Sequence, residues 1–155
     1  MPGFDIAFEP PKFKWLPVTI QIDERSWAFD ASAVRNDPVT ELVVATSRLL
    51  AEPCTEMVGF WLEPAWHVLE MTSDGNGTAS ITFWHRTGDN RRDAEAKAVA
   101  RMETRKLCRL LLNRLRSLHA ATGTDRFHAP DCWGKVFPDD AISCVFTRIR
   151  SQKVR

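Results

Sequence analysis

Hydrophobic and polar residues alternate in three short runs between Thr55 and His85. Glu63-Pro64 separates the first two runs, and the sequence SDGNG at 73–77 separates the second from the third. Both separators are typical turn sequences. Because successive side chains of a strand point to opposite faces, the pattern predicts a three-stranded antiparallel meander with two different faces.

One face of this meander is apolar and is expected to lie on the core. It carries Val58, Phe60, Leu62, His67, Leu69, Met71, Ala79, Ile81, Phe83 and His85. The other face is mainly polar around three tryptophans, and it carries Met57, Trp61, Glu63, Trp66, Val68, Glu70, Thr72, Thr78, Ser80, Thr82 and Trp84. Either the N-terminal segment or a helix packs on these indoles, or the face binds a partner, since tryptophan is enriched at interface hot spots.

The N-terminal part of the chain adds strands to this meander. Residues 1–14 are predicted to form an N-terminal strand or arm, because Phe4, Ile6 and Phe8 alternate with other residues. Alternation at 18–22 and the run at 27–29 predict a hairpin that joins the sheet, with its turn at 23–25.

Two shorter helices have clear start signals. Asp37 is a good N-cap and Pro38 suits the first helical position, while the apolar spacing from Val39 onward predicts a helix that ends before Pro53. Pro138 predicts the start of a last helix. Residues 151–155 are expected to form a flexible tail.

A longer helix is predicted from about Asp93 to Ala121, with Gly123 as its stop. Its apolar stripe consists of Val99, Met102, Leu107, Leu110, Leu111, Leu115 and Leu118. Its other side is basic, with Arg101, Arg105, Arg109 and Arg116. This side is either a solvated face or a phosphate-binding footprint for a nucleic acid.

Together these elements predict one α+β domain over residues 1–155, in which one long and two shorter helices pack on an antiparallel sheet of about five strands. A chain of 155 residues is long enough to bury a core without disulfides or metals. No apolar run approaches the ~20 residues that a membrane helix needs. The N-terminus also lacks the features of a secretory signal, so the protein is expected to be cytoplasmic.

The net charge of +1 hides an asymmetry along the chain. Residues 1–90 contain 6 Lys and Arg against 13 Asp and Glu, whereas residues 91–155 contain 15 against 7. Either half can steer a partner of opposite charge, if the fold keeps its charges together.

The sequence contains no recognisable catalytic or metal-binding constellation. The cysteines are widely spaced and predict reduced thiols. His67 and His85 fall on the predicted core face, either as hydrogen-bonded core residues or as neighbours that form a site with a carboxylate. Glu63 and Glu70 flank a hairpin and are expected to be solvated. The sequence therefore predicts a protein that is not an enzyme and that needs no cofactor or metal.

Several segments together resemble a set of small bacterial proteins. These are SAVRNDP at 32–38 followed by ELV at 41–43, FWLEP at 60–64, the long predicted helix, and Trp133 followed by Phe137-Pro138. The similarity covers roughly residues 18–150. The proteins of this set are encoded beside polymorphic toxins and are regarded as immunity proteins of contact-dependent inhibition, Rhs or type VI effectors.

The resemblance implies a protein that binds a cognate toxin domain in the producing cell and blocks its active site or its access to substrate. If that toxin is a cationic nuclease, we expect the tryptophan-bearing face to bind it. The candidate partner-binding residues are Trp61, Glu63, Trp66, Glu70 and Trp84. The alternative function is a nucleic-acid-associated accessory protein that uses the basic helix at 91–116.

Overall fold

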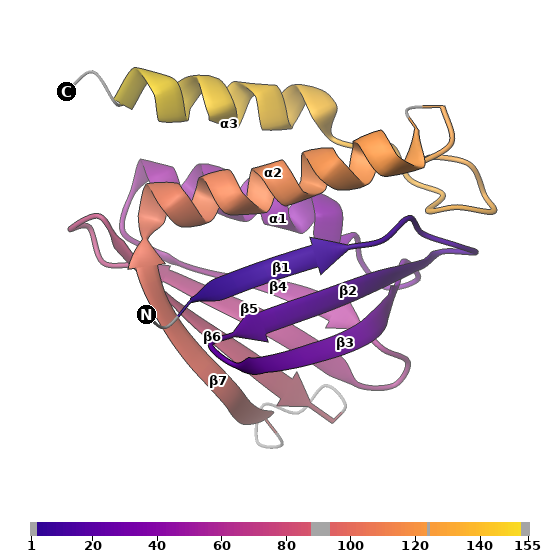
Figure 1. The fold of residues 1–155 in the computed structure, drawn as a ribbon, viewed down its shortest axis with the longest axis horizontal. Coiled ribbons are helices and arrows are strands. Elements are labelled where there is room, and N and C mark those ends of the chain that lie inside the picture. The colour runs from indigo at the N-terminus through magenta and orange to yellow at the C-terminus, as the bar shows by residue number, and fades with distance from the viewer. Residues whose placement is uncertain (1–2, 88–93, 124, 153–155) are drawn as a thin grey trace.

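The computed structural model describes residues 3–87, 94–123 and 125–152. In these residues it contains three helices and seven strands (Figure 1). In chain order they are β1 (Phe4–Phe8), β2 (Trp15–Ile22), β3 (Arg25–Ser32), α1 (Pro38–Ala51), β4 (Thr55–Trp61), β5 (Trp66–Ser73), β6 (Thr78–Arg86), β7 (Ala94–Glu103), α2 (Thr104–Thr122) and α3 (Asp139–Gln152).

The strands form one antiparallel sheet in which each strand lies beside its neighbour in sequence, in the order β1-β2-β3-β4-β5-β6-β7. The predicted α+β class is therefore confirmed. The prediction of about five strands is too low, because β1 pairs with β2 and because residues 94–103, predicted to be helical, form β7.

The sheet folds over on itself, so that β1–β3 lie in front of β4–β6 in Figure 1. Within the described residues, β3 and β4 share the single register pair Ser32↔Trp61, and α1 runs beside β4 where the halves separate. Aromatic rings join the halves on the inside, with ring centroids 5.0 Å apart for Trp27 and Phe83 and 5.5 Å apart for Phe29 and Phe60. The core thus fills the space between the two layers of one continuous sheet and extends to the buried sides of the three helices.

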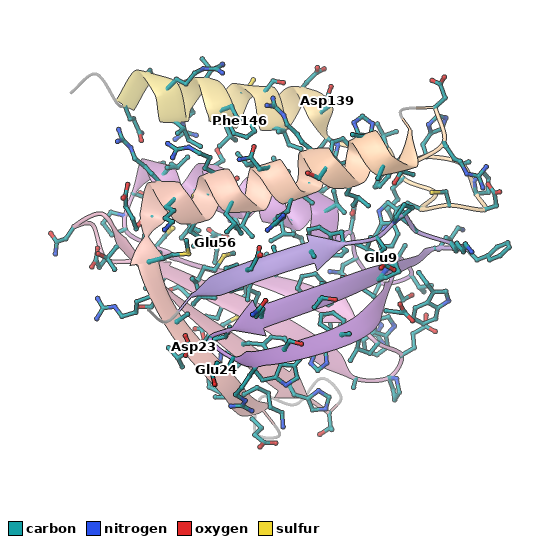
Figure 2. The ribbon with its side chains drawn as sticks, viewed as in Figure 1. Glu9, Asp23, Glu24, Glu56, Asp139 and Phe146 are labelled. Carbon is teal, nitrogen blue, oxygen red and sulfur yellow. The ribbon has the colours of Figure 1, made fainter. Side chains whose placement is uncertain are left out.

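The helices cover one edge of this folded sheet (Figure 1). The buried stripe of α2 consists of Leu107, Cys108, Leu111, Leu112, Leu115 and Leu118. On its other sides, the guanidinium of Arg114 binds both carboxylate oxygens of Asp5 at 3.0 and 2.7 Å. The guanidinium of Arg116 lies 4.1 Å from the ring centre of Phe146, which is labelled on α3 in Figure 2. Two arginines of α2 are thus used to attach it to β1 and α3.

The predicted helix from Asp93 to Ala121 is wrong in its first part. Residues 94–103 form β7, which pairs along its length with β6, and the helix begins only at Thr104. Val99, assigned to the apolar helical stripe, instead lies opposite Thr82 and is 56% exposed. Residues 91–93, which the prediction gave to the basic helix, lie outside the described residues.

The two shorter helices are confirmed. The side chain of Asp37 accepts hydrogen bonds from the backbone N–H groups of Val39 and Thr40, as its N-cap role requires. The last helix begins at Asp139, directly after Pro138. It extends through Ser151 and Gln152, so these two residues of the predicted tail are helical, and residues 153–155 lie outside the described residues.

Two loops meet at one end of the molecule, where the β1–β2 and α2–α3 connections lie side by side (Figure 1). The N–H of Phe13 donates to the carbonyl of Asp131 at 2.9 Å, and the N–H of Lys14 donates to that of Cys132. Trp133 is fully buried beneath them, and its Nε1 donates to Oδ1 of Asp37 at 3.2 Å. This indole therefore ties the α2–α3 loop to the start of α1.

Candidate functional site

The two faces predicted for the meander are found in β4–β6. The inner face is buried except at His67 and His85, which are half-buried, and at Leu62, which lies beyond the end of β4. We call the opposite side of β4–β7 the outer face. It is bordered by α1 along β4, and its Met57 and Val99 are 42% and 56% exposed. These side chains leave apolar area open to solvent on the outer face.

Tryptophans form a row that crosses one end of the outer face and continues over β3 to β2. The register places Trp15, Ser32, Trp61 and Trp66 opposite one another on four neighbouring strands. Trp61 is only 9% exposed, since the ring of Trp66 lies 4.8 Å from its own and the guanidinium of Arg35 lies 4.6 Å above it. Trp61 therefore supports Trp66 and contributes little surface itself.

Local backbone geometry explains how Trp66 lies flat against β4. A Cβ atom at Gly59 would be 2.9 Å from the indole of Trp66, so only glycine at this position leaves room for the ring. Trp15, which is 36% exposed, belongs to the same row but was absent from the predicted site. Its place depends on the β3–β4 pairing, which no local pattern indicates.

The remaining predicted residues lie further along the outer face. Nε1 of Trp84 donates to a carboxylate oxygen of Glu70 at 2.8 Å, and Glu70 lies opposite Met57. Glu63 is exposed beyond the end of β4 and accepts a hydrogen bond from Oγ of Ser32 at 2.8 Å. The structure thus places Trp66, Glu70 and Trp84 on one half-buried face, with Glu63 at its end.

A groove of about 420 Å³ joins this face at its β4 edge. This α1–β4 groove is lined by Asp37, Thr40, Glu41, Val44, Arg48, Glu56 and Met57. Val44 and Met57 are 43% and 42% exposed, so its surface is partly apolar. Its three carboxylates face one guanidinium, that of Arg48, which lies 3.5 Å from Glu56. The surface of the groove therefore combines acidic and apolar side chains.

Glu41 is the most enclosed carboxylate of the groove. Burial raises its pKa, whereas the hydrogen bond from Nδ2 of Asn36, the backbone N–H of Gly59 and the positive charge of Lys135 oppose that rise. Nδ2 of Asn36 also donates to the carbonyl of Gly59 at 2.7 Å. These bonds fix the first turn of α1 against β4 and so hold the shape of the groove.

The two histidines of the inner face are neighbours, which is one of the arrangements that the sequence allowed. His67, His85 and Glu95 lie opposite one another on β5, β6 and β7, and the Nδ1 atoms of the histidines are 3.2 Å apart. Glu95 is held by Nζ of Lys97 at 3.0 Å. Within the described residues, no group of three or more His, Cys, Asp or Glu side chains is arranged to hold a metal.

Burial between aromatic rings changes the acidity of His67. Its ring centroid lies 4.6 Å from that of Phe29 and 4.9 Å from that of Phe83. This burial, with a smaller contribution from the charge of His85, lowers the pKa of His67 to about 4. His67 is thus a neutral core residue around neutral pH.

We expect acid to destabilise the protein through His67. In the unfolded chain His67 titrates near its usual pKa of 6.5, so the unfolded state binds more protons than the folded state between pH 6.5 and about 4. The contribution of this group to the unfolding free energy should fall by on the order of 1 to 2 kcal/mol over that range, after allowance for partial exposure. Urea unfolding of the wild type and His67→Phe measures this difference, and His128→Gln is the exposed control. Parallel pH profiles for the wild type and His67→Phe would contradict it.

The predicted basic row is not a single helix face. Arg101 lies on β7 opposite Ser80, while Arg105, Arg109 and Arg116 lie on α2. The acidic residues of the N-terminal half are dispersed as well, since Figure 2 shows Glu9 at the end of β1, Asp23 and Glu24 at the β2–β3 turn, and Glu56 near the helices. The acidic residues of the N-terminal half therefore do not gather into one patch.

Comparison with protein-family models, with curated proteins and with solved structures returns no match for this chain. Among the described helices, none combines the length and the apolar character needed to cross a membrane.

Proposed function

We propose that this protein is a cytoplasmic immunity protein that binds a cognate toxin domain and neutralises it without catalysis. The observation that supports this proposal best is the α1–β4 groove, where exposed Val44 and Met57 lie among carboxylates beside the tryptophans of the outer face. Aromatic residues and methionine are enriched in the cores of protein interfaces, and polar, solvent-accessible residues form the rim.

The charges that line the α1–β4 groove determine which kind of toxin surface is complementary to it. Asp37, Glu41 and Glu56 outnumber Arg48 in the groove, and Glu70 lies beside Met57. A basic surface of the toxin domain complements them, since opposite potentials speed the encounter of two proteins. Trp66 and Met57 then supply the apolar area that slows dissociation.

Such a complex neutralises the toxin by covering the surface to which the toxin's substrate binds. A toxin that acts on a polyanion such as nucleic acid needs cationic residues around its active site. An immunity protein whose acidic groove covers those residues blocks the approach of the substrate. This mechanism needs no catalytic group on the immunity protein.

The test is co-expression with the C-terminal domain of the toxin-like protein encoded immediately upstream. We expect restored growth and a complex that copurifies. Met57→Lys, which adds a cation to the groove, is expected to abolish both, whereas Thr19→Ala, at an exposed position on β2, is the matched control. A wild-type protein that is folded by circular dichroism, yet neither rescues growth nor copurifies, would contradict the proposal.

A nucleic-acid-associated function is the second candidate, and one surface favours it. A hollow of about 360 Å³ on α2 is lined by Lys106, Arg109, Leu110, Asn113, Arg114 and Ser117. Arg114 already binds Asp5, which leaves two cations of the hollow for phosphates. Binding of DNA or RNA that weakens steeply with salt, and that is lost in Lys106→Glu/Arg109→Glu, would establish this function.

A further inference from the structure

The turn that leads into β2, residues Lys12–Trp15, has a backbone that its sequence does not favour. We call it the arm turn. Two hydrogen bonds close it, from the N–H of Lys12 to the carbonyl of Trp15 at 3.0 Å and back at 2.9 Å. The two central residues have φ values of 50° for Phe13 and 67° for Lys14. Positive φ at both central positions is the signature of hairpin turns that normally contain Asn-Gly, so Phe-Lys is disfavoured there.

Neighbouring backbone holds the arm turn in this conformation. Phe13 and Lys14 donate their N–H groups to the α2–α3 loop, and the carbonyl of Lys14 accepts from the N–H of Ala33 at 3.0 Å. The side chain of Lys14 lies across Gly134, with its Cε 3.1 Å from the position that a Cβ would take there. The disfavoured turn is therefore fixed from two sides.

The arm turn presents an exposed aromatic side chain between two cations. Phe13 is 74% exposed, and Lys12 and Lys14 on either side of it are exposed as well. Val136, which follows the Gly134 contact by two residues, is 78% exposed. Neither packing nor turn preference explains why a phenylalanine occupies position 13. Strained backbone that is held in place by the surrounding structure is characteristic of functional sites.

We propose that the arm turn is a second contact element for the toxin domain, in which Phe13 enters an apolar pocket whose rim carries carboxylates. This inference rests on the proposed immunity function. The positive charges of Lys12 and Lys14 are complementary to an acidic rim, and Phe13 is the anchor that fills the pocket. Trp15, the next residue, belongs to the tryptophan row, so one partner can contact the arm turn and the outer face together.

The two elements together define the class of toxin. Its surface is cationic opposite the α1–β4 groove and acidic opposite the arm turn. An enzyme that binds a polyanion and cleaves it at a carboxylate-lined, metal-binding centre has this distribution of charge. Phe13 and Lys14 would then occupy the catalytic pocket itself, with the ammonium group of Lys14 among carboxylates that otherwise hold a cation.

The double variant Phe13→Asn/Lys14→Gly separates a binding role from a structural one. Asn-Gly suits this turn, so the variant should melt about 2 to 8 °C higher than the wild type. Its affinity for the toxin domain encoded upstream, measured by calorimetry, should nevertheless fall by about tenfold or more. Phe13→Ala should weaken binding similarly, and Lys14→Glu should weaken it more than Lys14→Ala.

The matched control is Asp23→Gly. Asp23 also has a positive φ, 56°, in an exposed hairpin turn, but it lies at the end of the sheet away from the helices (Figure 2). This variant should leave the affinity unchanged. If the wild type binds the toxin domain and Phe13→Asn/Lys14→Gly binds it equally well, the inference is overturned while the proposed function stands. If the folded wild type does not bind, both are overturned.

Discussion

Replacing Trp133 by alanine is expected to lower the free energy of unfolding by about 3 to 5 kcal/mol. Trp133 is fully buried, and its Nε1 donates to Oδ1 of Asp37, the N-cap of α1. Its loss leaves a large cavity and removes the link between the α2–α3 loop and α1. Urea unfolding followed by circular dichroism measures the change.

The neighbouring residue Val136 supplies the control, since it is 78% exposed and Val136→Ala should change the stability by less than about 0.5 kcal/mol. If Trp133→Ala does not fold, Trp133→Phe keeps most of the packing and removes the hydrogen bond. It should cost about 1 to 2 kcal/mol. A loss below about 1 kcal/mol for Trp133→Ala in a folded protein would show that this indole does not hold the end of the domain together.

Replacing Trp66 by alanine is expected to weaken the proposed toxin complex by about 2 to 4 kcal/mol, as truncation of a central aromatic anchor does. Trp66 lies in the tryptophan row beside Gly59, at the junction of the outer face with the α1–β4 groove. Calorimetric titration of the toxin domain measures the loss, and Thr19→Ala serves as control. Trp61→Ala should act through stability more than through contact, because Trp61 is only 9% exposed.

The association rates of charge variants provide a second test of the same surface. Glu70→Lys and Glu63→Lys should reduce the association rate toward a basic partner, most strongly at low salt. Unchanged affinity in Trp66→Ala together with an unchanged association rate in both charge variants would exclude the outer face as the contact surface.

Local signals in the sequence were sufficient for the elements that depend on local physics. Alternation assigned the two faces of β4–β6, and the pair Asp37-Pro38 placed the start of α1. Pro138 placed the start of α3. In each case one residue type has a conformational preference strong enough to fix an element without its tertiary surroundings.

The errors concern residues whose structure depends on distant partners. Residues 94–103 contain four alanines, which favour a helix, yet these residues pair with β6. Ala98, Ala100 and Met102 alternate onto the inner face, but this alternation is recognised only once the pairing with β6 is known. The arm turn is also invisible in the sequence, because Phe-Lys gives no turn signal. The groove depends on how α1 sits beside β4, which no local pattern specifies.

The order of the strands has a consequence for how quickly the protein forms. Every strand pairs with its nearest neighbour along the chain, so most of the sheet closes through short loops, and the widest separation between paired strands is the one bridged by α1. A low average sequence separation between contacting residues favours rapid folding for a β-rich chain. In the proposed role such speed is useful, since the inhibitor has to be folded by the time its toxin is made.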